Sequence, residues 1–236
     1  MKLDRQRSEI AMCTRMLVAA GVMEYSGHVS ARLAEGDRFL IQRVADVRAE
    51  LEPDRLLVVD LDGRVLEGDG KPPSELFIHS EIYKRREDVG AVVHFHHDRT
   101  TLFSLVQGLE LVPVKNHAAR WATGIPVHHN AAHIDTPALG AALALTLGSA
   151  NGALLRAHGE VVVAEDVPTL FADAVHFVEN ADTLAQATVL GTVLPLDKDE
   201  TEAFLSTFDR QHHAEKLWAY YAASAAHAGV IPESWA

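Results

Sequence analysis

The chain has a single cysteine, Cys13, among its 236 residues. A disulfide within the chain is therefore impossible, which is typical of a protein from a reducing compartment. One cysteine also excludes the zinc sites that are built on several thiolates, so any metal site in this chain has to use other ligands.

Basic residues and long apolar runs are also scarce. Lys and Arg total 21 against 33 Asp and Glu, which gives a formal net charge of −12. No basic patch is visible, and this argues against nucleic acid as a partner. No apolar run approaches the roughly 20 residues of a membrane span, and charges interrupt the apolar positions of residues 1–22, unlike a signal peptide. We expect a cytoplasmic protein that binds neither nucleic acid nor membrane.

The composition that is present, with 48% hydrophobic residues, is that of one globular domain over residues 1–236, with a core at about 8–190 and a helical tail at about 200–225. Ser74, or a residue close to it, is the predicted cap of a helix. Turns are expected at Asp62–Gly63 and His158–Gly159. The mixture of strands and helices predicts an α/β or α+β fold. Helices are predicted at 4–21, 74–88, 99–109, 136–148, 166–191 and 201–225, and strands at 38–44, 55–68, 89–97 and 152–166.

Three histidines follow an apolar run in the stretch AVVHFHHDRT, residues 91–100. Side chains alternate between the two faces of a strand, so His94 and His96 point to one side and His97 points to the other. Such a pair is either two surface histidines or two metal ligands. His158 ends another apolar stretch, directly before a glycine that allows close backbone approach.

We favour a metal site made by His94, His96 and His158, because three neutral imidazoles leave positions open for a substrate. His97 is expected to pack or to support this site. The adjacent pairs 128–129 and 212–213 have no third partner nearby in the sequence, and they are interpreted as surface histidines.

Glu75 and His79 lie one turn apart at the start of the helix that follows KPPS. A carboxylate in a first helical turn often stabilises only the helix dipole. If Glu75 instead faces the metal, it becomes a candidate general acid or base, and His79 can share its pocket.

Together these motifs resemble the class II aldolase/adducin family, over roughly residues 8–190. The match rests on SGHVSARL, LLVVDLDGRVLEG, PPSELFIHSEIYKRREDVGAVVHFHH and LLRAHGEVVVAED, in this order. The resemblance implies an α/β/α fold around a mainly antiparallel sheet of about nine strands, assembled as a homotetramer with active sites at the subunit interfaces. It places one divalent metal ion on His94, His96 and His158, and the acid/base carboxylate on Glu75. Adducin-like members lack the metal histidines, so their presence here indicates an enzyme.

The chain also departs from the sugar-phosphate aldolases of the family. It has Gly27–His28 where they usually have Gly-Asn, and LIQRVADVRAELEP where they have a phosphate loop. The hydroxyl and glycine residues that would wrap a phosphate are missing. Arg43 and Arg48 stand there instead, and an arginine suits a planar carboxylate. Arg43 is the preferred anchor, and Arg48 is interpreted as a solvated side chain.

GHVSAR and PPSE are similar to a smaller branch of the family, which decarboxylates hydroxylated aromatic diacids such as a hydroxy-methylpyridine-dicarboxylate or a dihydroxyphthalate. The resemblance places substrate contacts on His28, Ser30, Arg43 and Ser74. The expected protein is a metal-dependent decarboxylase that uses Zn²⁺, Mn²⁺ or Fe²⁺. A class II aldolase for a non-phosphorylated substrate, a non-catalytic assembly module and an iron-dependent oxygenase stay open as alternatives.

Overall fold

Eight strands form one sheet, in the order β4-β3-β2-β1-β5-β8-β7-β6. The computed structural model describes residues 2–236. Neighbouring strands are antiparallel except β6 and β7, which run parallel. The mainly antiparallel sheet of the sequence prediction is thus confirmed. The strands are β1 (His28–Arg32), β2 (Arg38–Ile41), β3 (Leu57–Asp60), β4 (Val65–Glu67), β5 (Ala91–Phe95), β6 (Val127–His128), β7 (Gly152–Leu155) and β8 (Gly159–Ala164).

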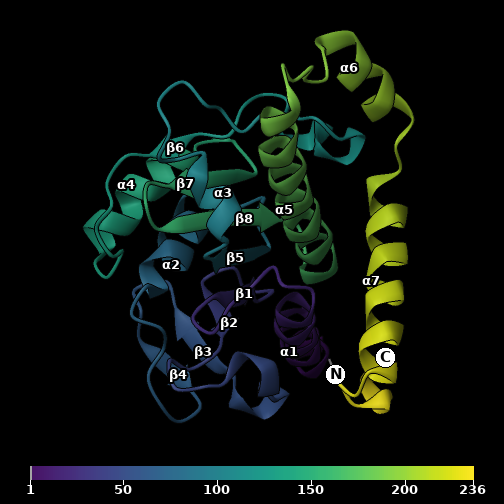
Figure 1. The fold of residues 1–236 in the computed structure, drawn as a ribbon. Helices are drawn as coiled ribbons and strands as arrows, with labels where there is room; N and C mark the ends of the chain where they lie inside the picture. Colours follow the sequence, from purple (N-terminus) through teal and green to yellow (C-terminus); the bar gives the residue numbers. More distant parts are fainter. Residues whose placement is uncertain (1) are drawn as a thin grey trace.

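Helices cover both faces of this sheet (Figure 1). One apolar core joins a sheet face to α1, α5 and α7, and a second core joins the opposite face to α2 and α4. In β5 the alternation sends Val93 and Phe95 to the first core and Val92 to the second. The three-layer α/β/α prediction is confirmed. The α-helices are α1 (Lys2–Ala19), α2 (Leu76–Arg85), α3 (Asp98–Leu102), α4 (Pro137–Leu147), α5 (Val167–Leu190), α6 (Lys198–Thr207) and α7 (Arg210–His227).

The N-cap of α2 lies at Glu75, one residue after Ser74, as the prediction of Ser74 or a residue close to it allows. The side chain of Glu75 makes no capping hydrogen bond. The carboxylate of Glu75 turns away from the helix end to accept a hydrogen bond from the backbone N–H of Ile134 at 3.0 Å, so a tertiary contact has replaced the local one.

The C-terminal segment also differs, because residues 201–225 do not form one helix. Asp209 separates α6 from α7, and its side chain accepts a hydrogen bond from the N–H of His212 as the N-cap of α7.

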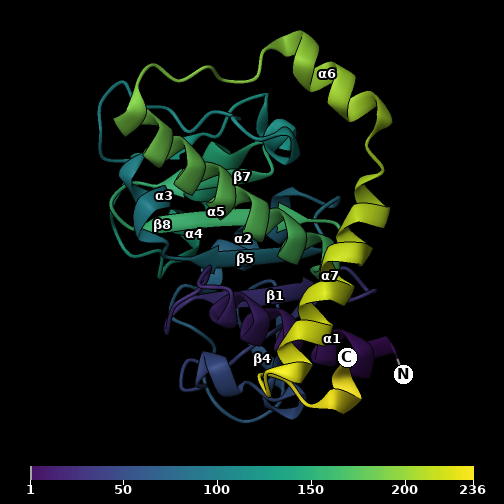
Figure 2. The same ribbon diagram turned by 45° about the vertical axis from the view of Figure 1, so that its right-hand side comes forward.

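The helix predicted at 99–109 is shorter in the structure, where it spans only α3. Figure 2 shows α7 running alongside α1, far in the sequence from its neighbour. No helix among residues 2–236 is long and apolar enough to span a membrane.

Candidate metal centre and its cavity

The three predicted metal ligands meet at one end of the central strands. His94 is buried one residue before the end of β5, His96 follows the strand on the same face, and His158 lies in the turn between β7 and β8. Their ring centroids are 4.6–5.1 Å apart. The turn needs the glycine that follows His158, because a Cβ on Gly159 would lie 2.3 Å from the backbone oxygen of Phe95 and 2.9 Å from His96. The predicted close backbone approach is therefore present.

Glu75 completes a group that we call the metal cluster: Glu75, His94, His96 and His158. One ligand atom from each lies within 4.8 Å of the others. The Oε2 atom of Glu75 is 3.4 Å from Nε2 of both His94 and His158. Nε2 of His94 is buried and has no hydrogen-bond partner. A divalent cation held by the three imidazoles fits this arrangement, since it would satisfy the unpartnered nitrogen, and the nearby carboxylate would balance its charge.

The electrostatics of the metal cluster also suit a cation. Burial alone would raise the pKa of Glu75, but its interactions with the neighbouring His158 and His94 outweigh burial and hold that pKa well below its ordinary value. Burial, followed by the nearby His94 and His158, lowers the pKa of His96 to about 3. At neutral pH the cluster therefore offers an ionised carboxylate and a neutral imidazole at His96, and these are the protonation states that bind metal ions.

A cavity of about 540 Å³ opens beside the metal cluster, within the range of small-molecule sites. Two of the predicted substrate contacts, His28 and Ser74, line it, together with Arg48, Glu75, His96 and His158. Six other residues line the cavity, and three of them lie outside every motif quoted above. The six are Glu24, Tyr25, Ser26, Val44, Pro73 and His133, of which Glu24, Tyr25 and His133 are outside the motifs.

His133 shows why such residues were missed. Its Nε2 atom lies 3.6 Å from Oε2 of Glu75 and 3.5 Å from the hydroxyl oxygen of Ser74. The residue stands in the loop between β6 and α4, where no periodicity or motif marks it. Ser26 lies similarly outside any strand, yet its hydroxyl oxygen is 3.1 Å from Nδ1 of His96.

His79 and Ser30 lie behind the cavity wall and do not line it. Both are fully buried. Nε2 of His79 lies 2.6 Å from Nδ1 of His28, and its Nδ1 lies 2.7 Å from the hydroxyl oxygen of Ser30. Ser30 in turn lies 2.7 Å from the hydroxyl oxygen of Tyr83. This chain of hydrogen bonds fixes the ring of His28, so His79 and Ser30 act on the cavity only through that ring.

The two arginines differ from their predicted roles, because Arg48, and not Arg43, lines the cavity. The guanidinium of Arg43 forms an ion pair with Asp46 at 2.5 Å and does not line the cavity. Arg48 lines the cavity and is only 5% exposed, so its interpretation as a solvated side chain is wrong. Arg48 donates hydrogen bonds to the backbone oxygens of Gly27 and Asp46. Within residues 2–236 it forms no ion pair with a carboxylate.

The position of the missing phosphate loop is occupied by a side chain. Gln42, fully buried, accepts a hydrogen bond from the N–H of Val29 at 3.0 Å and donates one to the oxygen of Gly27 at 3.0 Å. The amide thus occupies one backbone donor, the N–H of Val29, that an anion-binding loop would leave free.

Other predicted histidines are placed as follows. His97 turns to the opposite side of β5, as predicted, and its Nδ1 lies 3.0 Å from the hydroxyl oxygen of Thr100. His128 is buried, so its interpretation as a surface residue is wrong, and its Nδ1 lies 2.9 Å from the hydroxyl oxygen of Thr146.

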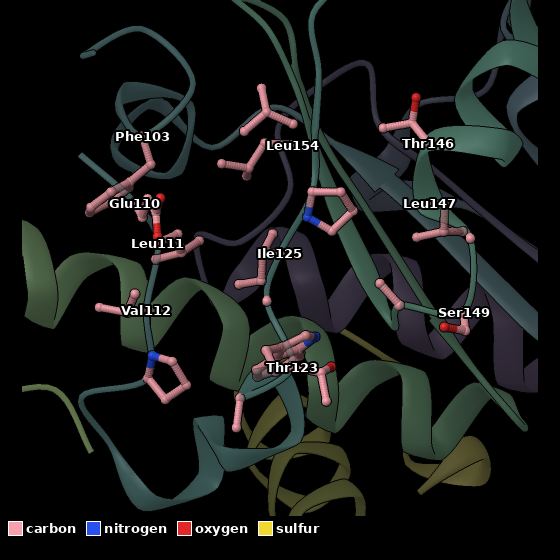
Figure 3. Close-up of a pocket in the computed structure, with 18 of the residues that line it drawn as sticks. Phe103, Glu110, Leu111, Val112, Thr123, Ile125, Thr146, Leu147, Ser149 and Leu154 are labelled. Carbon is pink, nitrogen blue, oxygen red and sulfur yellow. The ribbon is translucent and has the colours of Figure 1, made fainter. Parts of the chain in front are cut away.

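A larger cavity lies elsewhere, near β6 and β7. Its volume is about 730 Å³, and the apolar side chains Phe103, Leu111, Ile125 and Leu154 are among those that line it (Figure 3). Glu110 is its one charged lining residue, and no histidine lines it. Volume alone therefore does not identify the candidate active site. The smaller cavity is lined by the candidate metal ligands His96 and His158 and by the charged side chains of Glu75 and Arg48.

Known proteins share this fold and sequence pattern. The sequence profile of the Class II Aldolase and Adducin N-terminal domain matches residues 8–187. A 3,4-dihydroxyphthalate decarboxylase from Arthrobacter keyseri is 30% identical over 229 residues, which are 90% of this chain and 90% of that protein. A second one, from Rhodococcus jostii (strain RHA1), is 28% identical over 95% of this chain and 97% of that protein. The solved structure of an L-fuculose 1-phosphate aldolase superposes with a TM-score of 0.77 at 23% identity, covering 86% of this chain and 95% of that one, and so shows the fold.

Proposed function

The chain belongs to the class II aldolase and adducin family, and from this premise we propose that it is a metal-dependent decarboxylase of a hydroxylated aromatic or pyridine dicarboxylate. The two dihydroxyphthalate decarboxylases support this choice, because each is similar to nearly the whole chain. Within the family, both decarboxylases and aldolases break a carbon–carbon bond, so the substrate anchor has to distinguish them.

Arg48 is the observation that carries the proposal. It is a buried cation that lines the cavity, and its guanidinium donates hydrogen bonds to the backbone oxygens of Gly27 and Asp46. The carboxylate of Asp46 interacts with it electrostatically but is ion-paired with Arg43. A buried charge that shares its counter-ion is costly, so an anion in the cavity would stabilise it. A guanidinium binds a planar carboxylate through two parallel hydrogen bonds. A diacid supplies this carboxylate in addition to the one that leaves.

The absence of a phosphate cradle supports the same choice. Gln42 occupies the backbone groups of Gly27 and Val29, and no glycine-rich loop follows β2. A sugar phosphate would therefore lack the ring of N–H donors that usually binds its phosphate.

We propose that His94, His96 and His158 hold one divalent ion, which would supply Lewis-acid stabilisation of negative charge on a substrate oxygen. Glu75, ionised at neutral pH, is positioned to take a proton from the substrate hydroxyl and to return it to the ring carbon that loses carbon dioxide. The reaction then replaces a carboxylate with hydrogen and releases CO₂, without a redox cofactor. The ion is Zn²⁺ if imidazoles dominate its coordination, and Mn²⁺ or Fe²⁺ if oxygen ligands complete it.

His28 and Ser74 are proposed to orient the substrate at the cavity wall. The ring of His28 is held from behind by His79 and Ser30, so its cavity-facing edge presents a fixed hydrogen-bonding group. We therefore assign His79 and Ser30 as positioning residues and not as groups that contact the substrate.

We also propose that the chain assembles as a homotetramer with this cavity at a subunit interface. Tyr25 and Val44 line the cavity and are 85% and 51% exposed, which is typical of side chains that a partner covers. Light scattering coupled to size-exclusion chromatography tests this assembly: a mass of one chain would contradict it.

The function is tested by a CO₂-release screen over hydroxylated aromatic and pyridine diacids, with the metal-loaded protein and with protein stripped by a chelator. We expect CO₂ from at least one diacid and none after stripping. An aldehyde product from a non-phosphorylated hydroxy-carbonyl compound, without CO₂ from any diacid, would identify an aldolase instead.

A further inference from the structure

A second group of histidines lies where the C-terminal segment packs on the rest of the molecule. We call His117, His176 and His213 the C-terminal histidine cluster; they come from the 3₁₀ helix Asn116–Trp121, from α5 and from α7. One ring nitrogen from each lies within 4.8 Å of the others. The cluster shares no residue with the metal cluster. The prediction that His213 is a surface histidine without a third partner is therefore wrong.

The ring of His176 is oriented as in many metal sites. Its Nδ1 lies 3.2 Å from Oε2 of Glu179, so in the neutral ring the N–H points at the carboxylate. The lone pair is then on Nε2, which lies 2.9 Å from Nε2 of His213. A carboxylate that holds the far nitrogen of a histidine is a common support for a metal-bound imidazole.

His117 supplies a second, independent indication of a metal site. Its Nδ1 is buried and has no hydrogen-bond partner, and its ring is stacked against those of His176 and His213 with centroids 4.6 and 4.4 Å away. A buried imidazole nitrogen without a hydrogen-bond partner is available to bind a metal ion.

From this geometry we propose that the C-terminal histidine cluster is a second binding site for a divalent transition metal, of the class that prefers imidazole, with Zn²⁺ as the first candidate. The cavity beside the cluster has a volume of only about 60 Å³, enough for the ion and a water molecule but not for an organic substrate. The rings of Phe204 and Phe208 lie 5.7 and 5.3 Å from that of His117 and cover it. The site is thus structural.

The bound ion would attach the C-terminal helices to the core. His117 and His176 belong to the part of the chain that carries the sheet and α5, whereas His213 belongs to α7, beyond the 191–209 segment. Because His117 is stacked on its partners, its side chain must rotate to direct a nitrogen at the ion. The ion therefore replaces ring stacking with coordination bonds between α5 and α7.

Zinc content per chain tests this proposal, measured by mass spectrometry of the metal after loading with Zn²⁺ and gel filtration. His213→Asn and His117→Asn should each bind about one ion fewer than the wild type, because a three-imidazole site has no spare ligand. His212→Asn is the matched control, since His212 is exposed and adjacent on the same helix, and it should bind as much zinc as the wild type. Glu179→Gln should weaken the affinity of this ion about 10–100-fold.

Limited proteolysis of the 191–209 segment gives a readout that is independent of activity. Zinc should slow cleavage there in the wild type, in His212→Asn and in His96→Ala, but not in His213→Asn. Circular dichroism shows which variants are folded, and His117→Gln replaces any that are not. Wild-type zinc content in both His213→Asn and a folded His117 variant, or equal protection by zinc in His213→Asn, would overturn the proposal and leave the cluster as stacked, hydrogen-bonded packing.

Discussion

Nδ1 of His94 lies 2.8 Å from the backbone oxygen of Glu160. A carbonyl oxygen only accepts, so the proton of the neutral ring is on Nδ1 and the lone pair of Nε2 faces Oε2 of Glu75, 3.4 Å away. Two acceptors at this distance repel each other unless a cation or a proton lies between them. The pairing of His94 with Glu160 thus makes the cluster ready for a metal ion before any ion arrives.

His94→Ala, His96→Ala and His158→Ala are each expected to lose about one bound ion per chain and nearly all activity, because a site with three histidine ligands has no redundancy. Metal content and CO₂ release measure both effects. His97→Ala is the matched control, since its ring turns to the other side of β5 and contacts Thr100, and it should keep the ion. Full metal content in the His158→Ala protein would remove His158 from the ligand set.

Glu75→Gln should keep the fold and the metal but lower kcat about 10²–10⁴-fold, the usual contribution of a general acid or base. The amide oxygen of glutamine can still accept the hydrogen bond from the N–H of Ile134, so the loop before α4 stays in place. Steady-state kinetics measure the change. Unchanged turnover would reduce Glu75 to the N-cap residue of α2 and a buried partner of the histidines.

Arg48→Lys should raise KM for a diacid about tenfold or more, because it keeps the charge but loses the paired donors, and a hydrogen bond to a charged group contributes about 1.5–3 kcal/mol. The effect should be small for an analogue that lacks the second carboxylate. Arg43→Lys is the comparison: its guanidinium is bound to Asp46, so KM should hardly change. Equal losses on diacid and monoacid would show that Arg48 is structural.

Ser30→Ala should destabilise the protein by about 1–3 kcal/mol for each buried group that is left unpaired, which here are Nδ1 of His79 and the hydroxyl of Tyr83. Urea unfolding measures this free energy. Tyr83→Phe removes one of the two groups, so the double variant should lose less than the sum of the single variants. Strict additivity would mean that the hydrogen-bonded chain from His28 to Tyr83 does not act as a unit.

The stability of the metal-free protein should fall as the pH is lowered from about 6.5 towards about 3. Burial lowers the pKa of His79 from its ordinary 6.5 to about 3. Between these two pH values His79 is protonated in the unfolded chain and neutral in the folded chain. The free energy of unfolding therefore falls by about 1.4 kcal/mol for each pH unit. Urea unfolding at several pH values, with chelator present, should give a shallower dependence for His79→Gln. Parallel dependences for the two proteins would show that His79 does not titrate in this window.

Much of the molecule could be predicted from residue order. The period of two in AVVHF and the period of the α5 stretch follow from local backbone geometry, which depends on neighbouring residues alone. Because a strand alternates its faces, the placement of His94 and His96 on one face and of His97 on the other also follows locally. The distinctive combination of these histidines with Ser-Glu and Ala-His-Gly indicates the family.

Contacts between distant segments were decided only by the tertiary structure. The sequence favours Arg43 as the anchor, but the choice depends on Asp46, which forms an ion pair with Arg43, and on the packing that buries Arg48 against Gly27. Likewise Ser74 is a suitable helix cap, but Glu75 occupies that position because its carboxylate is used by His94, Ile134 and His158, which lie 19, 59 and 83 residues away along the chain.

The C-terminal histidine cluster shows most clearly which features depend on tertiary contacts and not on local sequence. His117, His176 and His213 are separated by whole helices, and each taken alone is an ordinary histidine. No local pattern couples them, because their contact depends on how α7 packs against α5 and the 3₁₀ helix. The sequence by itself determined the strand, its faces and the family, since these depend on short-range geometry. The anchor arginine and the second histidine cluster were decided by packing, which depends on the whole chain.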